Sequence, residues 1–302
     1  MSDGTVGTRP TPVDLHLHTC ASDGDDSAAV LAERCVEAGV TVAAVTDHDT
    51  LRSVPAFTAA AAGRFTVVPG CEVTTRWGEG EAHLLAYWVS GDGFAERIGR
   101  IRDSELAWWR RWVAAAQAYG VPLDWARVER EIGPDRIGYL GDYLALLLRV
   151  AGDDERFARY AGDTRRLVAE LCAPGRPLHV PPPWTPTLPE AIGWVVAAGG
   201  VAVLAHPARL LPADVDPVTA LGEVRAAGLA GLEVWTTWHT PAESRRLAEV
   251  CARLDLVATA GSDYHGPRVK SWARGPGLLP QAPPEPMDMV AALHARRPAW
   301  AG

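Results

Sequence analysis

Nine side chains that could bind divalent cations lie at or beside the ends of short apolar segments. Six are imidazoles and three are carboxylates: His16, His18, Asp23, His48, Glu72, His83, His206, Asp263 and His265. His16 and His18 are two positions apart, so on a strand both imidazoles face the same side, and Asp263 and His265 repeat this spacing. Imidazole and carboxylate ligands without thiolate suit Zn, Mn or Fe, and nine are too many for one ion. The sequence therefore predicts two or three divalent metal ions.

Each of these residues, considered alone, could instead have a purely structural role. A single histidine at the end of a strand is more often a hydrogen-bonded core or turn residue than a metal ligand. The set as a whole is harder to explain in that way. Unpaired carboxylates and imidazoles in a buried pocket carry a desolvation cost that only metal ions or mutual pairing would offset.

The segments that carry these residues alternate with Ala-rich segments of helical periodicity. The apolar runs at 13–18, 40–49, 65–75, 82–89, 200–207, 231–235 and 256–265 are typical of buried parallel strands. Helices are expected at 27–38, 189–198, 218–227 and 241–254. This alternation predicts an α/β fold. In a barrel of parallel strands, the loops after the strands form one mouth, where the nine groups could converge.

Between residues 93 and 183 the pattern changes to consecutive helices, which we interpret as an inserted helical subdomain. Its mostly apolar stripe, which includes Ile101, Trp109 and Trp112, favours internal packing over a substrate-binding role. The predicted domains are a metal-binding barrel at 13–92 and 184–275, the inserted subdomain at 93–183, and a C-terminal strap at 276–302 that ends in a short helix.

Composition excludes several classes of protein. The chain has 302 residues, of which 48% are hydrophobic and 22% charged, enough for a sizeable core. A net charge of -8 argues against a surface that binds long duplex nucleic acid. Five scattered cysteines without a C-x-x-C pattern fit a reducing cytoplasm. No apolar segment is long enough to span a bilayer, so no membrane association is expected. The oligomeric state is not set by the sequence.

Six motifs resemble, in order, those of the PHP (polymerase and histidinol phosphatase) family. They are DLHLHTCASDG, AVTDHDT, VPGCEVTT, HLLAY, AVLAHP and GSDYHG, which cover about residues 13–92 and 185–266. The resemblance is strongest to its small stand-alone phosphoesterases of the 3',5'-nucleoside bisphosphate phosphatase type. It implies a distorted (β/α)7 barrel that holds three Mn, Fe or Zn ions.

The resemblance also implies how the ligands divide among the ions. One ion would take His16, His18, Glu72 and Asp263. A second would share Glu72 and take His83 and the neighbourhood of His206, and a third would take Asp23, His48 and His265. Outside this set, the resemblance brings Arg209 and His239 to the mouth as phosphate or leaving-group contacts.

The sequence departs from the family pattern in the inserted subdomain. Related phosphoesterases carry an Arg-Pro-His-Ile-Ala type segment there, whose Arg and His face the substrate phosphate. The corresponding stretch, 137–149, reads IGYLGDYLALLLR and lacks that motif. The metal site therefore transfers from the family, whereas the nucleotide substrate does not.

The implied function is a metal-dependent phosphoesterase that hydrolyses a small phosphorylated metabolite or nucleotide. The nucleophile would be a metal-bridging hydroxide, because two ions about 3.5 to 4 Å apart can activate water and clamp both reacting oxygens. Asp263 would orient the hydroxide, Arg209 would contact phosphate, and His239 or a metal-bound water would protonate the leaving group.

Three other functions remain in view. A phosphodiesterase or exonuclease acting on short oligonucleotides is the nearest in chemistry. An amidohydrolase-type C–N hydrolase is a second, although many of these bridge their metals through a carboxylated strand lysine, and the only lysine, Lys270, follows the last predicted strand. A non-catalytic metal-stabilised binding module is a third. It would be expected to lose ligands, and none is missing.

Overall fold

The computed structural model describes residues 8–133, 140–211, 214–270 and 272–299. By its internal contacts the chain divides into two compact units: one contains Met1–Gly99 and Thr185–Gly302, and the other contains Arg100–Trp184. All nine predicted metal ligands belong to the first unit. The sequence-based domain boundaries at 92/93, 183/184 and 275/276 stay predictions.

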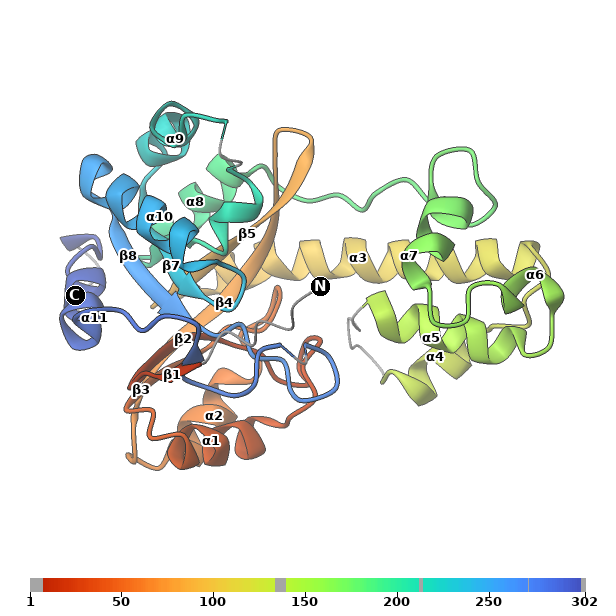
Figure 1. Ribbon diagram of the computed structural model, residues 1–302, viewed down its shortest axis with the longest axis horizontal. Coiled ribbons are helices and arrows are strands. Elements are labelled where there is room, and N and C mark those ends of the chain that lie inside the picture. The colour runs from red at the N-terminus through yellow and green to blue at the C-terminus, as the bar shows by residue number, and fades with distance from the viewer. Residues whose placement is uncertain (1–7, 134–139, 212–213, 271, 300–302) are drawn as a thin grey trace. The chain divides into compact units, whose positions relative to one another are not determined.

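The first unit is built around a seven-stranded sheet (Figure 1). The strands lie in chain order: β2 (Val13–Leu17), β3 (Val42–Val45), β4 (Thr66–Trp77), β5 (Gly80–Tyr87), β6 (Val201–Leu204), β7 (Leu229–Thr236) and β8 (Val257–Gly261). Every residue of β2, β3 and β6 is buried. Strands β3 and β6 are continuous apolar runs, as expected where both faces are covered, whereas β2 is buried although it contains Asp14 and His16.

The first and last strands of the sheet approach each other and nearly close it into a barrel. The contact continues beyond the strand ends: the backbone N–H of Asp263 donates to His16 O, and that of His18 donates to Tyr264 O, both at 2.9 Å. Leu17 and Tyr264 form a parallel bridge at the same place. The predicted distorted (β/α)7 barrel is confirmed. The closure also places the ligands of β2 beside those that follow β8.

Strand β5 corrects the expectation that every strand is parallel. It runs antiparallel to both β4 and β6, whereas the other neighbouring pairs are parallel. Only a tight turn joins β4 to β5, with Trp77 paired to Gly80 and Gly78 at a φ of +59°. So short a connection permits an antiparallel hairpin and no helical crossover. The beginning of β5 therefore lies at the edge of the sheet where β4 and β6 end.

Five helices of the first unit lie between strands of its sheet in the chain: α1 (Ala28–Glu37), α2 (Val54–Ala61), α8 (Leu188–Ala197), α9 (Pro217–Ala226) and α10 (Pro241–Leu254). Helix α11 (Pro286–His294) follows the last strand. Capping boxes begin α8 at Thr187 and α10 at Thr240, which agrees with the helix starts expected from the sequence. A two-stranded sheet pairs β1 (Arg9–Pro10) with β9 (Leu278–Leu279). Among the described residues, no helix is long and apolar enough to cross a membrane.

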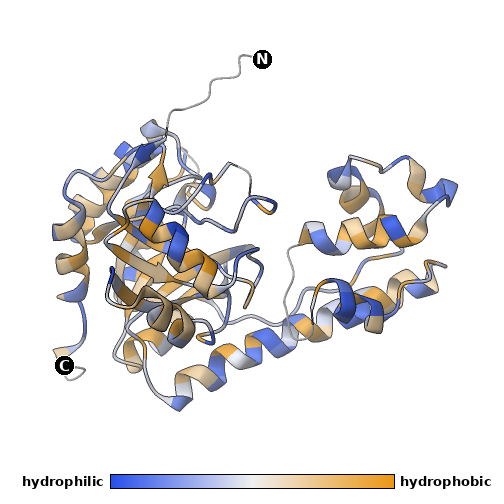
Figure 2. Ribbon diagram, turned by 90° about the horizontal axis from the view of Figure 1, so that it is seen from below, coloured by the Kyte–Doolittle hydropathy of each residue, from blue (hydrophilic) through white to orange (hydrophobic). Residues whose placement is uncertain are grey.

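The second unit is helical. Its elements are the C-terminal part of α3 (Asp92–Ala118), then α4 (Trp125–Glu131), α5 (Leu140–Ala151), α6 (Glu155–Ala158), α7 (Thr164–Leu167) and the π-helical turn η1 (Val168–Cys172). Polar and apolar residues alternate along the long helix α3 (Figure 2). Trp109 and Trp112 of this helix are buried, and Trp109 stacks on Tyr143 of α5 with ring centroids 3.6 Å apart. This is the packing expected of the apolar stripe. Of the segment 137–149, residues 137–139 lie outside the described residues, and the rest belongs to α5.

Gly261 tests how tightly the closing strands pack. A Cβ atom built there would lie 2.3 Å from His16 Cβ and 2.7 Å from Glu233 Oε1. We expect Gly261→Ala to lower the free energy of unfolding by about 1–3 kcal/mol, because overpacked cores must shift backbone or side chains. Urea denaturation measures the change.

Gly222→Ala is the matched control for this substitution. Gly222 lies within α9, and nothing approaches its Cβ position within 4 Å. Alanine should stabilise that helix by about 0.5–1 kcal/mol. Equal stabilisation by both substitutions would contradict the tight packing of β8 on β2.

Candidate metal centre

The predicted ligands come from successive strands of the barrel and from the loops that follow them. His16 lies in β2, Glu72 in β4 and His83 in β5. The remaining six lie in loops: His18 and Asp23 after β2, His48 after β3, His206 after β6, and Asp263 and His265 after β8. The structure brings all nine side chains together at one edge of the sheet.

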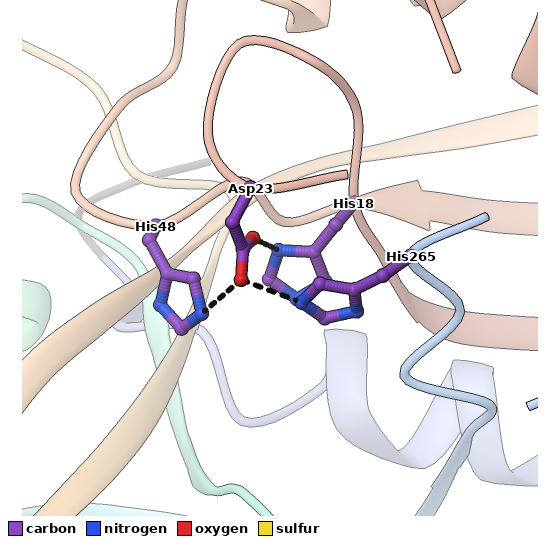
Figure 3. A group of neighbouring side chains, drawn as sticks. All are labelled: His18, Asp23, His48 and His265. Carbon is purple, nitrogen blue, oxygen red and sulfur yellow. Dashed lines mark ion pairs between the residues drawn. The ribbon is translucent and has the colours of Figure 1, made fainter. Parts of the chain in front are cut away.

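Three overlapping groups of ligand atoms are close enough to hold metal ions. In each group, one ligand atom per residue lies within 4.8 Å of all the others. The groups are His16, His18, Glu72 and Asp263; His18, Asp23, His48 and His265 (Figure 3); and His48, Glu72 and His83. The first group is the set that the family resemblance implies for one ion. The second group adds His18 to the set implied for the third ion. The last group contains Glu72 and His83, as implied, but has His48 in place of His206, which belongs to none of the three groups although its Nε2 lies 3.3 Å from Glu72 Oε1.

Glu72 is the centre of the cluster. Its Oε2 lies 3.0 Å from His16 Nε2 and 3.1 Å from His18 Nε2. Its Oε1 lies 3.1 Å from His83 Nδ1 and 3.3 Å from His206 Nε2. Burial raises the pKa of Glu72, but nearby histidines, His16 first among them, outweigh this effect and hold the pKa well below its usual range. Glu72 is therefore an anionic group that contacts imidazoles through both oxygens.

Asp23 and Asp263 flank Glu72 in the cluster. Asp23 Oδ2 lies 3.1 Å from His265 Nε2, and Asp23 Oδ1 lies 3.6 Å from His18 Nδ1 (Figure 3). Asp263 Oδ1 lies 3.3 Å from Nε2 of both His16 and His18. Burial raises the pKa of both carboxyls, yet neighbouring cations hold each pKa well below its usual range. Lys270 is the largest such influence on Asp263, and His265 on Asp23.

The nitrogen and oxygen atoms of the cluster are suited to coordinate divalent cations. Five buried atoms of the cluster have no hydrogen-bond partner among the described residues: His18 Nε2, His48 Nδ1, Glu72 Oε1, Asp263 Oδ1 and His265 Nε2. All of them except His48 Nδ1, four atoms in all, lie within 3.4 Å of another member of the cluster. Buried polar atoms without hydrogen bonds are rare, because each one costs free energy. Nitrogen and oxygen lone pairs that converge in this way are the ligands expected for Zn, Mn or Fe.

The strained backbone at two strand ends helps to aim ligands into the cluster. His206 follows β6 with a φ of +31°, and Asp263 follows β8 with a φ of +53°. Positive φ is unfavourable for residues other than glycine, and such strain collects at functional sites. At both positions the chain turns sharply where the strand ends, and the side chain faces the cluster.

Glu233 is a supporting residue that the sequence analysis missed. It is fully buried in β7, its Oε1 lies 2.9 Å from His16 Nδ1, and its Oε2 accepts the backbone N–H of His206 at 2.8 Å. A carboxylate on the far nitrogen of a ligand histidine fixes the ring orientation and tautomer. The available signal was a lone acidic residue within the apolar run GLEVW.

Asp47 and Asp14 support the loops that carry the ligands. Asp47 accepts the backbone N–H and the hydroxyl of Thr19, both at 2.7 Å, and the hydroxyl of Ser22 at 2.7 Å. Asp14 accepts the backbone N–H of Ser262 at 2.9 Å and that of Gly277 at 2.7 Å. These bonds hold the segments that lead to Asp23 and Asp263.

The structure places Arg209 and His239 near the cluster but outside its ligand groups. The exposed guanidinium of Arg209 lies 4.6 Å from the ring centroid of Trp238, which is 5.8 Å from that of His206. His239 is 4% exposed, and both of its ring nitrogens contact backbone atoms. Nδ1 lies 2.9 Å from Val234 O and thus donates, while Nε2 accepts from Ala208 N at 3.3 Å. Their predicted catalytic roles stay predictions.

A barrel with buried imidazoles and carboxylates gathered at one edge of its sheet defines a metal-binding class of α/β protein. Residues 14–167 match the PHP domain, and the chain belongs to the PHP domain family, as its motifs predict. It is 28% identical over 298 residues to the 3',5'-nucleoside bisphosphate phosphatase of Chromobacterium violaceum, covering 95% of this chain and 99% of that protein. It is 28% identical over 261 residues to a 5'-3' exoribonuclease of Haemophilus influenzae, covering 84% and 90% of the two chains.

Solved structures agree with this family. A protein of Bifidobacterium adolescentis described as a metal-dependent phosphoesterase shares 26% identity with a TM-score of 0.74, covering 96% of this chain and 98% of that one. An amidohydrolase of Chromobacterium violaceum, solved with bound sulfate and no metal, shares 27% identity with a TM-score of 0.75, covering 96% and 99%. The chain therefore shares its fold with both solved proteins over nearly their whole length.

Metal binding should release protons from the cluster. In the metal-free protein, burial lowers the pKa of His18 and His83, but neighbouring carboxylates raise them to about 9 and about 10. A histidine must lose its proton to bind a metal. Burial also lowers the pKa of His16, but Glu72 and the other carboxylates raise it well above its usual value. At pH 7.5 we expect Zn²⁺ to displace about three protons from His16, His18 and His83, and the release should fall as pH rises through 9 to 10. An indicator dye in weakly buffered solution measures it.

The variant His83→Ala controls for protons that come from elsewhere, including bound water. It should release about one proton fewer than the parent protein at pH 7.5. Equal release from both proteins would show that His83 is not protonated in the metal-free state.

Glu233→Gln tests whether the carboxylate of Glu233, which contacts Nδ1 of His16, orients that imidazole. We expect metal affinity to fall about 10- to 100-fold, the usual cost of changing an outer carboxylate that holds a ligand histidine. Competition with a chromophoric chelator measures the affinity. Glu190→Gln changes a carboxylate that caps α8 away from the cluster and should leave the affinity unchanged. If Glu233→Gln behaved in the same way, His16 would be oriented without Glu233.

Proposed function

We propose that this PHP-family chain is a metal-dependent phosphoesterase that hydrolyses a phosphate ester of a small metabolite or nucleotide. The observation that carries the proposal is the buried cluster of imidazoles and carboxylates, with four ligand atoms that no hydrogen bond satisfies. If these side chains served only to pack the core, nothing would offset the free-energy cost of removing so many polar groups from water.

The three ligand groups would hold two or three divalent ions, with Mn, Fe or Zn as the candidates. When bound, such ions supply Lewis acidity, which lowers the pKa of water and neutralises charge on the phosphoryl oxygens. Glu72 is placed to bridge ions because its two oxygens face different histidines. His16 is held for this task by Glu233, which occupies its other ring nitrogen.

The remaining roles fall to residues that bind or orient. Asp263 Oδ1 has no hydrogen-bond partner among the described residues and faces the ligand groups, so Asp263 would bind an ion and orient the attacking hydroxide. The guanidinium of Arg209 is exposed and could contact substrate phosphate. A proton donated by His239 to the leaving group would require its Nε2 to give up the contact with Ala208 N. The contact with Ala208 N also indicates a second role for His239, which is to hold the turn after β6 in place.

The relatives support small nucleotides as the first substrates to try. The Chromobacterium violaceum relative is named for its action on 3',5'-nucleoside bisphosphates and aligns over nearly the whole chain. A 5'-3' exoribonuclease activity is the second candidate, because the Haemophilus influenzae protein of that name aligns over 84% of the chain. For an amidohydrolase, the lysine that bridges metals in many such enzymes is absent from these strands, since Lys270 follows β8 and pairs with Asp263.

Substitution of the cluster tests the assignment. We expect His18→Ala and Asp263→Ala each to lose bound metal and to lower kcat/KM on p-nitrophenyl phosphate at least about 100-fold, because each removes a ligand of the central group. Elemental analysis and steady-state kinetics give both readouts. His294→Ala, a histidine far from the ligand groups in the sequence and exposed in α11, is the control and should keep both properties.

Full metal content and full activity in His18→Ala and Asp263→Ala would remove these residues from the site. Substrates then separate the candidate functions: adenosine 3',5'-bisphosphate for the phosphatase, a 5'-phosphorylated oligoribonucleotide for the exonuclease, and a panel of amides for the rival hydrolase. Amide turnover without any phosphate release would overturn the proposal.

A further inference from the structure

The only lysine of the chain is buried against a predicted metal ligand. Lys270 is one of 29 basic residues, and the other 28 are arginines. Lys270 is only 8% exposed, and its Nζ donates to Asp263 Oδ2 at 2.6 Å. An ammonium is a compact point charge with three donors, whereas a guanidinium is a wide planar fork. Lysine therefore appears here at a position that demands a small cation.

A second donor binds the same oxygen atom. The indole Nε1–H of Trp238, in the loop after β7, donates to Asp263 Oδ2 at 2.5 Å. The ammonium of Lys270 lies 5.3 Å from the centroid of the Trp238 ring, so the two donors also contact each other. Asp263 Oδ2 is thus fully engaged by two N–H groups.

The other oxygen of Asp263 has the opposite environment. Oδ1 has no hydrogen-bond partner among the described residues and lies 3.3 Å from Nε2 of both His16 and His18. One oxygen of this carboxylate is therefore held by donors outside the ligand groups, and the other faces the ligands.

The two other ligand carboxylates are not divided in this way. Glu72 contacts imidazoles through Oε1 and Oε2 alike, at 3.1 Å from His83 and 3.0 Å from His16. Asp23 Oδ2 lies 3.1 Å from His265 Nε2, while its Oδ1 lies 3.6 Å from His18 Nδ1 and also accepts the Ser22 hydroxyl at 3.3 Å. Only Asp263 therefore has one oxygen that contacts donors outside the ligand groups and no imidazole, so the shared cluster environment does not explain its division.

The backbone around Asp263 limits how far its carboxylate can turn. The residue has a φ of +53°, and its N–H donates to His16 O at 2.9 Å. Trp238 is fixed on its other sides by the ring of Trp272, with centroids 5.3 Å apart, and by the guanidinium of Arg209 at 4.6 Å. Both the carboxylate and one of its donors are therefore held in place.

We propose that Lys270 and Trp238 are positioning residues that restrict Asp263 to binding its ion through Oδ1 alone. A carboxylate that binds through both oxygens occupies two coordination positions, and one that binds through a single oxygen leaves a position for water or substrate. The restriction matters for the proposed phosphoesterase function, which needs such a position, but the ligation itself can be tested without any substrate.

Cadmium NMR of the Cd²⁺-loaded protein tests the restriction, because each bound ion gives its own resonance and added oxygen ligands move it upfield. In Lys270→Met, Asp263 Oδ2 keeps only the Trp238 donor and should join the coordination of the ion bound by Asp263. We expect one resonance to move upfield while the others stay in place. Trp238→Phe keeps a packed ring but removes the indole donor, and it should move the same resonance by a smaller amount.

Arg34→Met is the matched control. The Arg34 Nε–Asp26 Oδ2 ion pair has the same length of 2.6 Å, and Asp26 belongs to none of the ligand groups. This variant should leave every resonance in place. Circular dichroism checks the fold of each variant, and Trp238→Phe keeps the test decisive if Lys270→Met does not fold.

Spectra of Lys270→Met and Trp238→Phe that superimpose on the parent spectrum would overturn the proposal and leave Lys270–Asp263 as a structural ion pair. The NMR measurement uses no substrate, so its outcome does not depend on whether the proposed function is correct. A restricted Asp263 in a protein without phosphatase activity would reject only the function, and an active enzyme with unchanged spectra would reject only the restriction.

Discussion

The desolvation of three carboxylates and six imidazoles in one buried cluster is the constraint on which the rest of this structure depends. Glu72 alone lies within about 3.4 Å of five histidine rings, and burial opposes the charge of each group. Mutual attraction offsets part of this cost in the metal-free protein, and divalent cations would offset the rest. Glu233, Asp47, Asp14 and Lys270 are buried for the same reason, since each holds a ligand or a ligand loop in place.

The architecture of the sheet explains how ligands so distant in sequence can meet. Parallel strands deliver His18, His48, His206 and Asp263 just beyond their C-terminal ends, as the α/β pattern implies. His83 reaches the same edge from the beginning of its strand because β5 is inverted within an otherwise mostly parallel sheet. The tight turn after Trp77 thus sets the direction in which His83 approaches the cluster, although the turn itself carries no predicted ligand.

Much of this site could be predicted from the sequence because its signals are local. The i, i+2 spacing of His16 and His18, and the polar residues that end apolar runs, identify strands and ligands together. Glu233 could not be assigned, because a single acid in an apolar strand specifies no partner until β2 and β7 are placed in space. The direction of β5 was missed because a buried apolar run looks the same in both orientations, and only the short link at Gly78 distinguishes them. The contact between Lys270 and Asp263 could not be predicted, because Lys270 lies in a loop after β8 whose path the sequence does not specify.

The helical unit at Arg100–Trp184 interrupts the barrel between two strands that pair directly, since Leu84 of β5 lies opposite Leu204 of β6. The entropy lost when a chain excursion is closed grows only with the logarithm of its length, and each doubling costs only about 0.6 kcal/mol. An excursion of this kind can therefore lengthen, shorten or change its sequence with little penalty for the sheet that supports the ligands.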